Sequence, residues 1–229
     1  MISNYKIPGF LLVSLGGLFL STGGALFKLF ENQDVWTIYF WRSFFFTPAV
    51  LLFLFFTSKN QVIKKFKSLG LIGIICGALY ASGSGAYMFA MKYTTVANVL
   101  FIISTQTFML AIGGYFILKE KINISTAIAI IMASVGIYIM IGTKVSNGTM
   151  LGNSLAFVTP LCFTSIVMII RKYKQIDMVP AVALSGVICM IVGALLSKDL
   201  TLNTHDLFLA FLFGSIQYAP GFICLTLGS

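Results

Sequence analysis

Residues 69–121 read LGLIGIICGALYASGSGAYMFAMKYTTVANVLFIISTQTFMLAIGGYFILKEK. They contain two apolar segments without a charged side chain, 69–91 and 95–118, separated by only a few residues. At about 1.5 Å per helical residue, each segment covers roughly 35 Å, which exceeds the roughly 30 Å hydrocarbon core of a bilayer. The stretch therefore predicts a transmembrane helical hairpin.

Polar and small residues inside this hairpin gather on one face and at mid-depth. The first segment carries five of them at steps of four, three, four and three, which places them on one helix face: Gly73, Gly77, Tyr80, Ser84 and Tyr87. The second has the run STQT at 104–107, near its middle. Because polar groups in hydrocarbon are costly unless they face protein or water, we expect the hairpin to line a cavity.

The composition indicates a polytopic membrane protein. Hydrophobic residues make up 59% of the 229 residues and charged residues 9%, with 22 Phe, which is more apolar material than one soluble core holds. The net charge of +9 lies in short loops between the apolar segments and not on a nucleic-acid-binding face. The four cysteines lie in apolar runs without ligand spacing, and the only histidine, His205, is in a loop. We expect no metal, no cofactor and no enzymatic activity.

Eight apolar segments are predicted to be transmembrane helices: 7–30, 35–57, 69–91, 95–118, 124–143, 152–170, 180–197 and 206–228. Basic residues accumulate on the cytoplasmic side of a membrane. With a cytoplasmic N-terminus, ten Lys and Arg fall on the inside and four on the outside, and Arg42 lies within a helix. The sequence therefore predicts an inner-membrane protein with its N-terminus in the cytoplasm.

An internal repeat relates the two ends of the chain. A shift of 143 residues aligns five pairs: Gly9 with Gly152, Thr22 with Ser165, Lys28 with Arg171, Phe30 with Tyr173 and Asp34 with Asp177. A shift of 138 then aligns Tyr80 with Tyr218. The period contains five spans, an odd number, so the second copy has the opposite orientation, as in many secondary transporters. We expect a five-helix repeat at 7–143 and an incomplete one, of three helices, at 152–229, which gives eight of ten helices.

Four short stretches resemble a known family: AMKYTTVANVL at 90–100, LKEKI at 118–122, GIYI at 136–139 and WRSF at 41–44. They are similar to EamA-type permeases of the drug/metabolite transporter superfamily, and the resemblance covers essentially the whole chain. It implies ten spans in two inverted five-helix repeats. Thr107 stands where many members carry a proline in helix four, so the resemblance does not imply the kink that such a proline produces.

Seven residues are candidate substrate contacts: Gln106, Thr107, Tyr80, Ser84, Tyr87, Tyr218 and Arg42. Each has a structural alternative. Gln106 would instead bond a neighbouring helix, and the tyrosines would pack through Gly73 and Gly77. Arg42 would either be anchored by Glu31 or Asp34, or attract an anionic group of the substrate.

On the first helix, Gly17 and Gly24 share a face and are predicted to permit close helix contact. Lys28 and Arg171 fall near helix ends and are interpreted as interfacial, with gating as the alternative. All six acidic residues lie in loops or at helix ends. No acid is therefore placed to carry a proton through the membrane interior, which favours exchange or uniport.

These features predict a transporter that moves a small polar or amphipathic metabolite, such as an amino acid or related compound, by alternating access. The expected partners are this small-molecule substrate and the lipid bilayer. The alternatives are a truncated chain that does not transport, or one that completes its bundle by pairing with another chain, for example as a homodimer. An intramembrane enzyme is disfavoured because the chain offers no nucleophile paired with a base at membrane depth.

Overall fold

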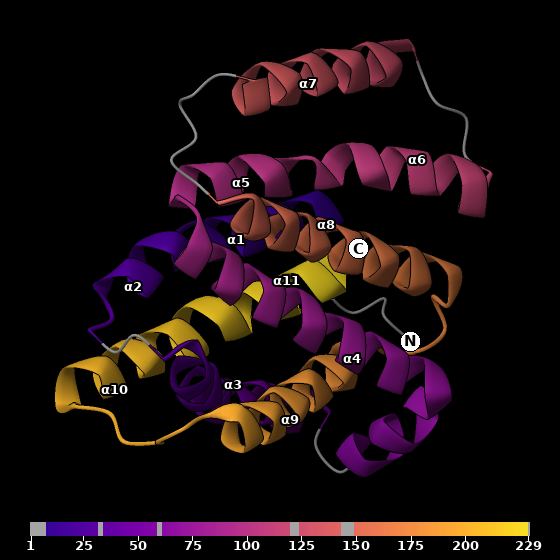
Figure 1. Cartoon of the computed structure of the whole chain (residues 1–229). Coiled ribbons are helices and arrows are strands. Elements are labelled where there is room, and N and C mark those ends of the chain that lie inside the picture. The colour runs from indigo at the N-terminus through magenta and orange to yellow at the C-terminus, as the bar shows by residue number, and fades with distance from the viewer. Residues whose placement is uncertain (1–7, 32–33, 59–60, 120–123, 143–148, 229) are drawn as a thin grey trace. The chain divides into compact units, whose positions relative to one another are not determined.

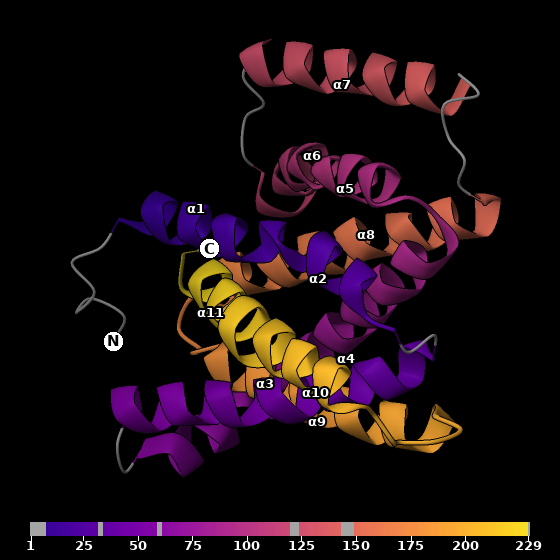
Figure 2. The same ribbon diagram turned by 90° about the vertical axis from the view of Figure 1, so that its left-hand side faces the viewer.

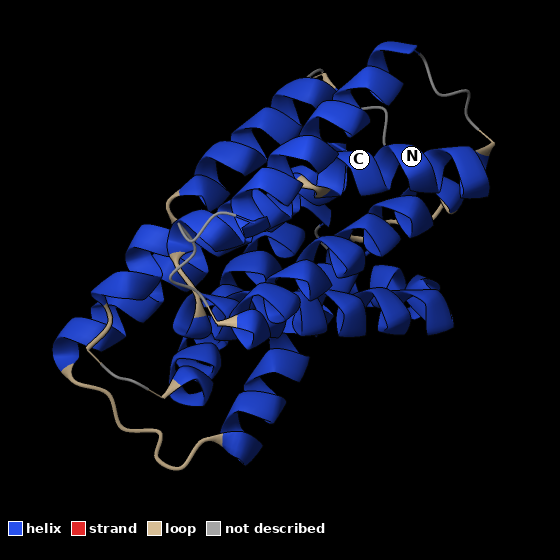
Figure 3. Ribbon diagram, turned by 45° about the horizontal axis from the view of Figure 1, so that its top comes forward, coloured by secondary structure: helices blue, strands red, loops and turns tan. Residues whose placement is uncertain are grey.

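The computed structural model describes residues 8–31, 34–58, 61–119, 124–142 and 149–228, and every regular element among them is a helix (Figure 3). The predicted all-α fold is therefore confirmed. The elements are α1 Gly9–Ser21, α2 Gly23–Leu29, α3 Val35–Ser58, α4 Val62–Tyr93, α5 Val96–Ser104, α6 Gln106–Leu118, α7 Ile124–Gly142, α8 Met150–Lys172, α9 Val179–Leu196, α10 Thr204–Phe211, the π-helix η2 Leu212–Tyr218 and α11 Ala219–Gly228 (Figure 1).

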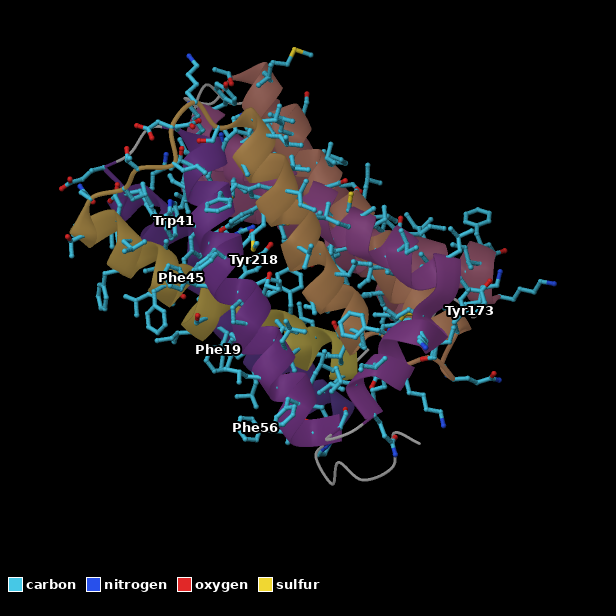
Figure 4. The ribbon with its side chains drawn as sticks, turned by 90° about the horizontal axis from the view of Figure 1, so that it is seen from below. Phe19, Trp41, Phe45, Phe56, Tyr173 and Tyr218 are labelled. Carbon is cyan, nitrogen blue, oxygen red and sulfur yellow. The ribbon has the colours of Figure 1, made fainter. Side chains whose placement is uncertain are left out.

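Among the described residues, seven helical spans are long and apolar enough to cross a membrane: Gly9–Leu29, Val35–Ser58, Val62–Tyr93, Val96–Ile117, Met150–Lys172, Val179–Leu196 and Thr204–Gly228. Helix α7 occupies the segment predicted as the remaining span. Large apolar side chains on these helices are exposed, such as Phe56 at the end of α3 (Figure 4). Such a surface suits contact with lipid chains.

The chain forms two compact units, one from residues 1–81 and 173–229 and one from residues 82–172. The first unit holds α1, α2, α3, the first part of α4, α9, α10, η2 and α11. The second holds the rest of α4 with α5 to α8. Within α4, Gly70 has φ of 53°, a backbone conformation that favours glycine. The predicted span 69–91 corresponds to the helix that follows this break.

Helices α3 and α9 pack against each other in the first unit (Figure 2). They run antiparallel, because Gly193 lies against Phe40 and Gly186 against Thr47. At one end, the hydroxyl oxygens of Thr37 and Ser197 lie 2.7 Å apart. At the other end, Lys65 Nζ lies 2.6 Å from a carboxylate oxygen of Asp177. Loops that the charge pattern assigns to the same side of the membrane therefore meet one another.

The N-terminal end of α3 is tied to the loop after α9 by polar bonds. Trp41 Nε1 donates to the carbonyl of Leu200 at 2.6 Å. The carboxylate of Asp34 accepts from Thr37 Oγ1 at 2.8 Å and from Ser197 Oγ at 3.3 Å. Burial raises the pKa of Asp34, but the bond from Thr37 and those from Trp36 and Ser197 outweigh it, so its pKa lies below the usual value. This carboxylate is therefore charged at neutral pH.

Helices α1 and α11 cross at two pairs of glycines. A Cβ on Gly9 would meet the carbonyl oxygen of Gly228 at 3.0 Å, and one on Gly16 would meet that of Gly221 at 2.9 Å. The two pairs are seven residues apart on both helices, so the helices run antiparallel. Gly17 was predicted for this role, but nothing lies within 4 Å of its Cβ position. That prediction is wrong, because the periodicity of a helix identifies its faces without showing which face meets a neighbour.

Gly16→Leu is expected to separate α1 from α11 and to lower the stability of the purified protein by about 1–3 kcal/mol, because the added side chain has no space. Gly17→Leu is the matched control and should leave the melting temperature nearly unchanged. Thermal unfolding in detergent measures both. Equal melting temperatures of the two variants would contradict the glycine crossing.

In the second unit, α8 packs against α5 and α6. Thr94 Oγ1 donates to Asn153 Oδ1 at 2.9 Å, which links the end of α4 to the start of α8. The predicted span 95–118 is interrupted at Thr105. The hydroxyls of Ser104 and Thr105 each donate to a carbonyl three residues back, at 2.6 Å, and such bonds disturb the helical ladder. This helix is therefore irregular at Thr105, although position 107 is threonine and not proline.

Candidate functional site

The guanidinium of Arg42 lies among three aromatic rings inside the first unit. Its Cζ is 4.2 Å from the ring centre of Tyr218, 5.2 Å from that of Tyr39 and 5.3 Å from that of Phe213. These four residues are called the Arg42 cluster below. Arg42 is only 1% exposed and is seven residues, or about 10 Å, into α3. Cation–π attraction stabilises a charge in such surroundings, and Figure 4 shows Tyr218 beside α3.

Hydrogen bonds hold Tyr39 of the Arg42 cluster and the neighbouring Tyr80 in place. The thiol of Cys189 on α9 donates to Tyr39 Oη at 2.9 Å, and the Tyr39 hydroxyl donates to the carbonyl of Ala81 at 2.7 Å. Tyr80 bonds to Thr226 through their hydroxyls at 2.8 Å. The ring of Phe222 lies 4.3 Å from that of Tyr218 and 5.3 Å from that of Tyr80, centre to centre. The aromatic cluster is therefore held in place from α3, α4, α9 and α11.

The first helix is interrupted next to this cluster. Helix α1 ends at Ser21 and α2 begins at Gly23. Ser21 Oγ donates to the carbonyl of Leu18 at 2.7 Å, and Thr22 Oγ1 to that of Phe19 at 3.1 Å. These bonds have the same form as those at Ser104 and Thr105. A Ser-Thr pair therefore marks both interruptions.

A π-helical turn, η2, interrupts the last span. Pro220 follows it and has no N–H, so it cannot donate to the carbonyl of Ile216, which its ring also displaces. The backbone widens, and the N–H of Ala219 donates to the carbonyl of Gly214, five residues back. Such π-segments are frequent at functional sites. Both α1 and α2 pack against η2.

Gln217 joins the two interruptions. Its Nε2 donates to the carbonyl of Leu20 at 3.1 Å, immediately before the break in the first helix. The residue is 4% exposed. Its Oε1 is buried and has no hydrogen-bond partner within the described part of the chain. Sequence analysis missed this residue, although a glutamine beside Tyr218 and before Pro220 in an apolar run was the available signal.

The predicted site residues fall in both units. Arg42, Tyr80 and Tyr218 lie together in the first unit. The ring of Tyr218 contacts the Arg42 guanidinium on one side and the ring of Phe222 on the other, and Phe222 contacts Tyr80. The other four belong to the second unit: Ser84, Tyr87, Gln106 and Thr107. At the start of α6, Gln106 is half-buried and Thr107 is exposed. Substrate contact at all seven positions remains a prediction.

The acidic residues that could have anchored Arg42 bond to other groups. Asn203 Nδ2 donates to a carboxylate oxygen of Glu31 at 2.7 Å, and Asp34 accepts from Thr37 and Ser197 as described above. Asp206, in the first turn of α10, is 1% exposed and accepts from the backbone N–H of Glu31 at 3.1 Å. These contacts stabilise one end of the first unit, whereas the surroundings of the Arg42 guanidinium are aromatic.

Apolar spanning helices, two of them interrupted beside a buried cation, define a polytopic membrane protein with the features of a carrier. The model of the EamA-like transporter family matches residues 7–142. The chain belongs to this family and is a multi-pass membrane transporter. It is also similar to an uncharacterized transporter of Clostridium kluyveri, with 24% identity over 236 residues that cover 94% of this chain and 75% of the relative.

Proposed function

We propose that this transporter moves a small polar or amphipathic metabolite, such as an amino acid or a related compound, by alternating access. The main supporting observation is the Arg42 cluster, which lies where η2 meets α3, and the interrupted first span packs against η2. Binding sites of secondary transporters are commonly built from discontinuous helices. The proposal involves transport and no chemical step on the solute.

The chemistry of the cluster suits an amphipathic solute with a carboxylate. A planar guanidinium recognises a carboxylate through paired hydrogen bonds. The rings of Tyr39, Phe213 and Tyr218 offer apolar faces to the rest of the solute, and tyrosine also offers a polar edge. A small metabolite with both kinds of group fits this combination.

Two aspartates support the inverted repeat. Asp34 and Asp177 are counterparts under the shift of 143 residues. A carboxylate oxygen of Asp34 accepts from the N–H of Trp36 at 3.2 Å, and one of Asp177 accepts from the N–H of Val179 at 3.0 Å. The same local motif therefore begins α3 and α9, which run in opposite directions. We propose repeats at 7–143 and 152–229 that enter the membrane with opposite orientation.

The membrane is proposed to be the inner cell membrane, with a cytoplasmic N-terminus, because the predicted inside loops are rich in Lys and Arg. Cysteines introduced at Lys28 and Arg171 test this arrangement with a membrane-impermeant thiol reagent on intact and on lysed cells. We expect labelling of Arg171→Cys only after lysis and of Lys28→Cys in both. Labelling of both cysteine variants from the same side of the membrane would contradict the inverted repeat.

Transport itself is tested by uptake of labelled amino acids and related metabolites into proteoliposomes. We expect uptake of at least one solute by the wild-type protein, and slower uptake by Gln106→Ala and Tyr80→Phe. An imposed pH gradient should not drive this uptake, because the proposal places no titrating acid at membrane depth. Absence of uptake for every solute would contradict the proposal. Normal uptake by both variants would exclude Gln106 and Tyr80 as substrate contacts.

A further inference from the structure

Gln217 lies in an apolar span, yet its two polar atoms are in different situations. Nε2 donates to the carbonyl of Leu20 at 3.1 Å. A carbonyl oxygen only accepts hydrogen bonds, so this contact fixes which end of the amide is nitrogen. Oε1 is therefore held in one direction, as an acceptor.

The Oε1 atom is buried without a hydrogen-bond partner among the described residues. A buried acceptor that bonds neither protein nor water is destabilising, and more so in a low-dielectric interior. A methionine or leucine would fill the position without this cost. A polar residue buried inside a membrane span points to a function in the transport path.

The position of Gln217 agrees with such a function. It belongs to η2 and bonds to the last residue but one of α1, so it lies between the two interrupted helices. The ring centre of the next residue, Tyr218, lies 4.2 Å from Cζ of the Arg42 guanidinium. The acceptor of Gln217 and the ring that contacts the Arg42 cation thus occupy neighbouring positions of η2.

We propose that Gln217 determines specificity by accepting, through Oε1, a hydrogen bond from an N–H or O–H group of the transported solute. This inference rests on the proposed transport function. A solute without a donor would leave Oε1 unsatisfied when bound, and sites built to bond a polar group discriminate strongly against analogues that lack it.

The test uses uptake into proteoliposomes by the full chain, with matched probes built on the leucine and phenylalanine skeletons. For each skeleton, three probes carry a donor: the amino acid, its N-acetyl derivative and its α-hydroxy analogue. Two probes lack one: the N,N,N-trimethyl derivative and the α-methoxy analogue. The three donor probes distinguish an ammonium, an amide and a hydroxyl as the group that Oε1 accepts.

Wild-type protein is expected to take up at least one donor probe about tenfold faster than its donor-free counterpart, as the loss of one hydrogen bond implies. Gln217→Met has a similar length and no oxygen, and should lose this preference. Gln217→Glu keeps an acceptor oxygen and should retain it. Ser215→Ala is the matched control, because Ser215 Oγ also lies on η2 and donates only to the carbonyl of Phe45 at 3.0 Å. It should keep the preference of the wild type.

Melting temperatures verify that the variants are folded. Equal uptake of donor and donor-free probes by wild-type protein would overturn the inference while transport stands, and so would an unchanged preference in Gln217→Met. A preference retained by Gln217→Met and lost by Gln217→Glu would also overturn it. Absence of uptake of every probe would overturn the proposed function together with this inference.

Discussion

Arg42→Gln is expected to lower the uptake of a carboxylate-bearing solute by at least about a hundredfold, because a desolvated charged contact contributes several kcal/mol and each 1.4 kcal/mol is tenfold. Arg42→Lys keeps the charge but loses the planar group that lies over the Tyr218 ring, so its uptake should be intermediate. Initial uptake rates in proteoliposomes measure both variants.

The competing interpretation makes Arg42 a structural anchor, and neutral probes distinguish the two. If the guanidinium binds the solute carboxylate, Arg42→Gln should spare the uptake of the corresponding methyl ester or primary amide relative to the free acid. If it only holds α3 against η2, uptake of charged and neutral solutes should fall together, and the melting temperature should fall with them. Equal losses for the acid and its amide would contradict substrate recognition by Arg42.

The positions of the helices could be predicted from sequence because one physical constraint determines them. A chain in hydrocarbon must satisfy its backbone internally, and the bilayer thickness fixes the length required. Helix α3 at Val35–Ser58 accordingly differs from the predicted 35–57 by one residue at its C-terminal end, and α9 at Val179–Leu196 is shifted by one residue from the predicted 180–197.

The interruptions within the spans were not predicted, because each depends on a local competition for one or two hydrogen bonds. Ser21 and Thr22 bond backbone carbonyls of their own helix, and Pro220 removes a donor. Hydropathy averaged over twenty residues does not detect such changes. These interruptions are nevertheless what shapes the candidate site.

Two residues of the Arg42 cluster were sequence candidates because their charge or the repeat identified them. Arg42 stood out as a cation well inside a span, and Tyr218 as the counterpart of Tyr80. Gln217 had neither signal, and its partner Leu20 is 197 residues away in the sequence. Only the tertiary structure brings that carbonyl to the glutamine.

Gly214→Ala is expected to disrupt the site through one methyl group. A Cβ at this position would overlap the carbonyl oxygen of Arg42 and lie 3.0 Å from the backbone nitrogen of Phe46. Both are backbone atoms of α3, so no side-chain rotation relieves the contact, and η2 must move away from α3. We expect the free energy of unfolding to fall by about 1–3 kcal/mol. Uptake should fall further, because Phe213 and Tyr218 on η2 form part of the Arg42 cluster.

Gly17→Ala is the matched control for this variant. It makes the same chemical change in another span, where nothing lies within 4 Å of the added Cβ. Alanine favours a helix over glycine by up to about 1 kcal/mol, so this control should be neutral or stabilising. Thermal unfolding and uptake, measured on both variants in parallel, separate the contact from the general effect of alanine. Wild-type stability and uptake in Gly214→Ala would show that η2 and α3 tolerate separation, and that the position of the two rings is not what binding requires.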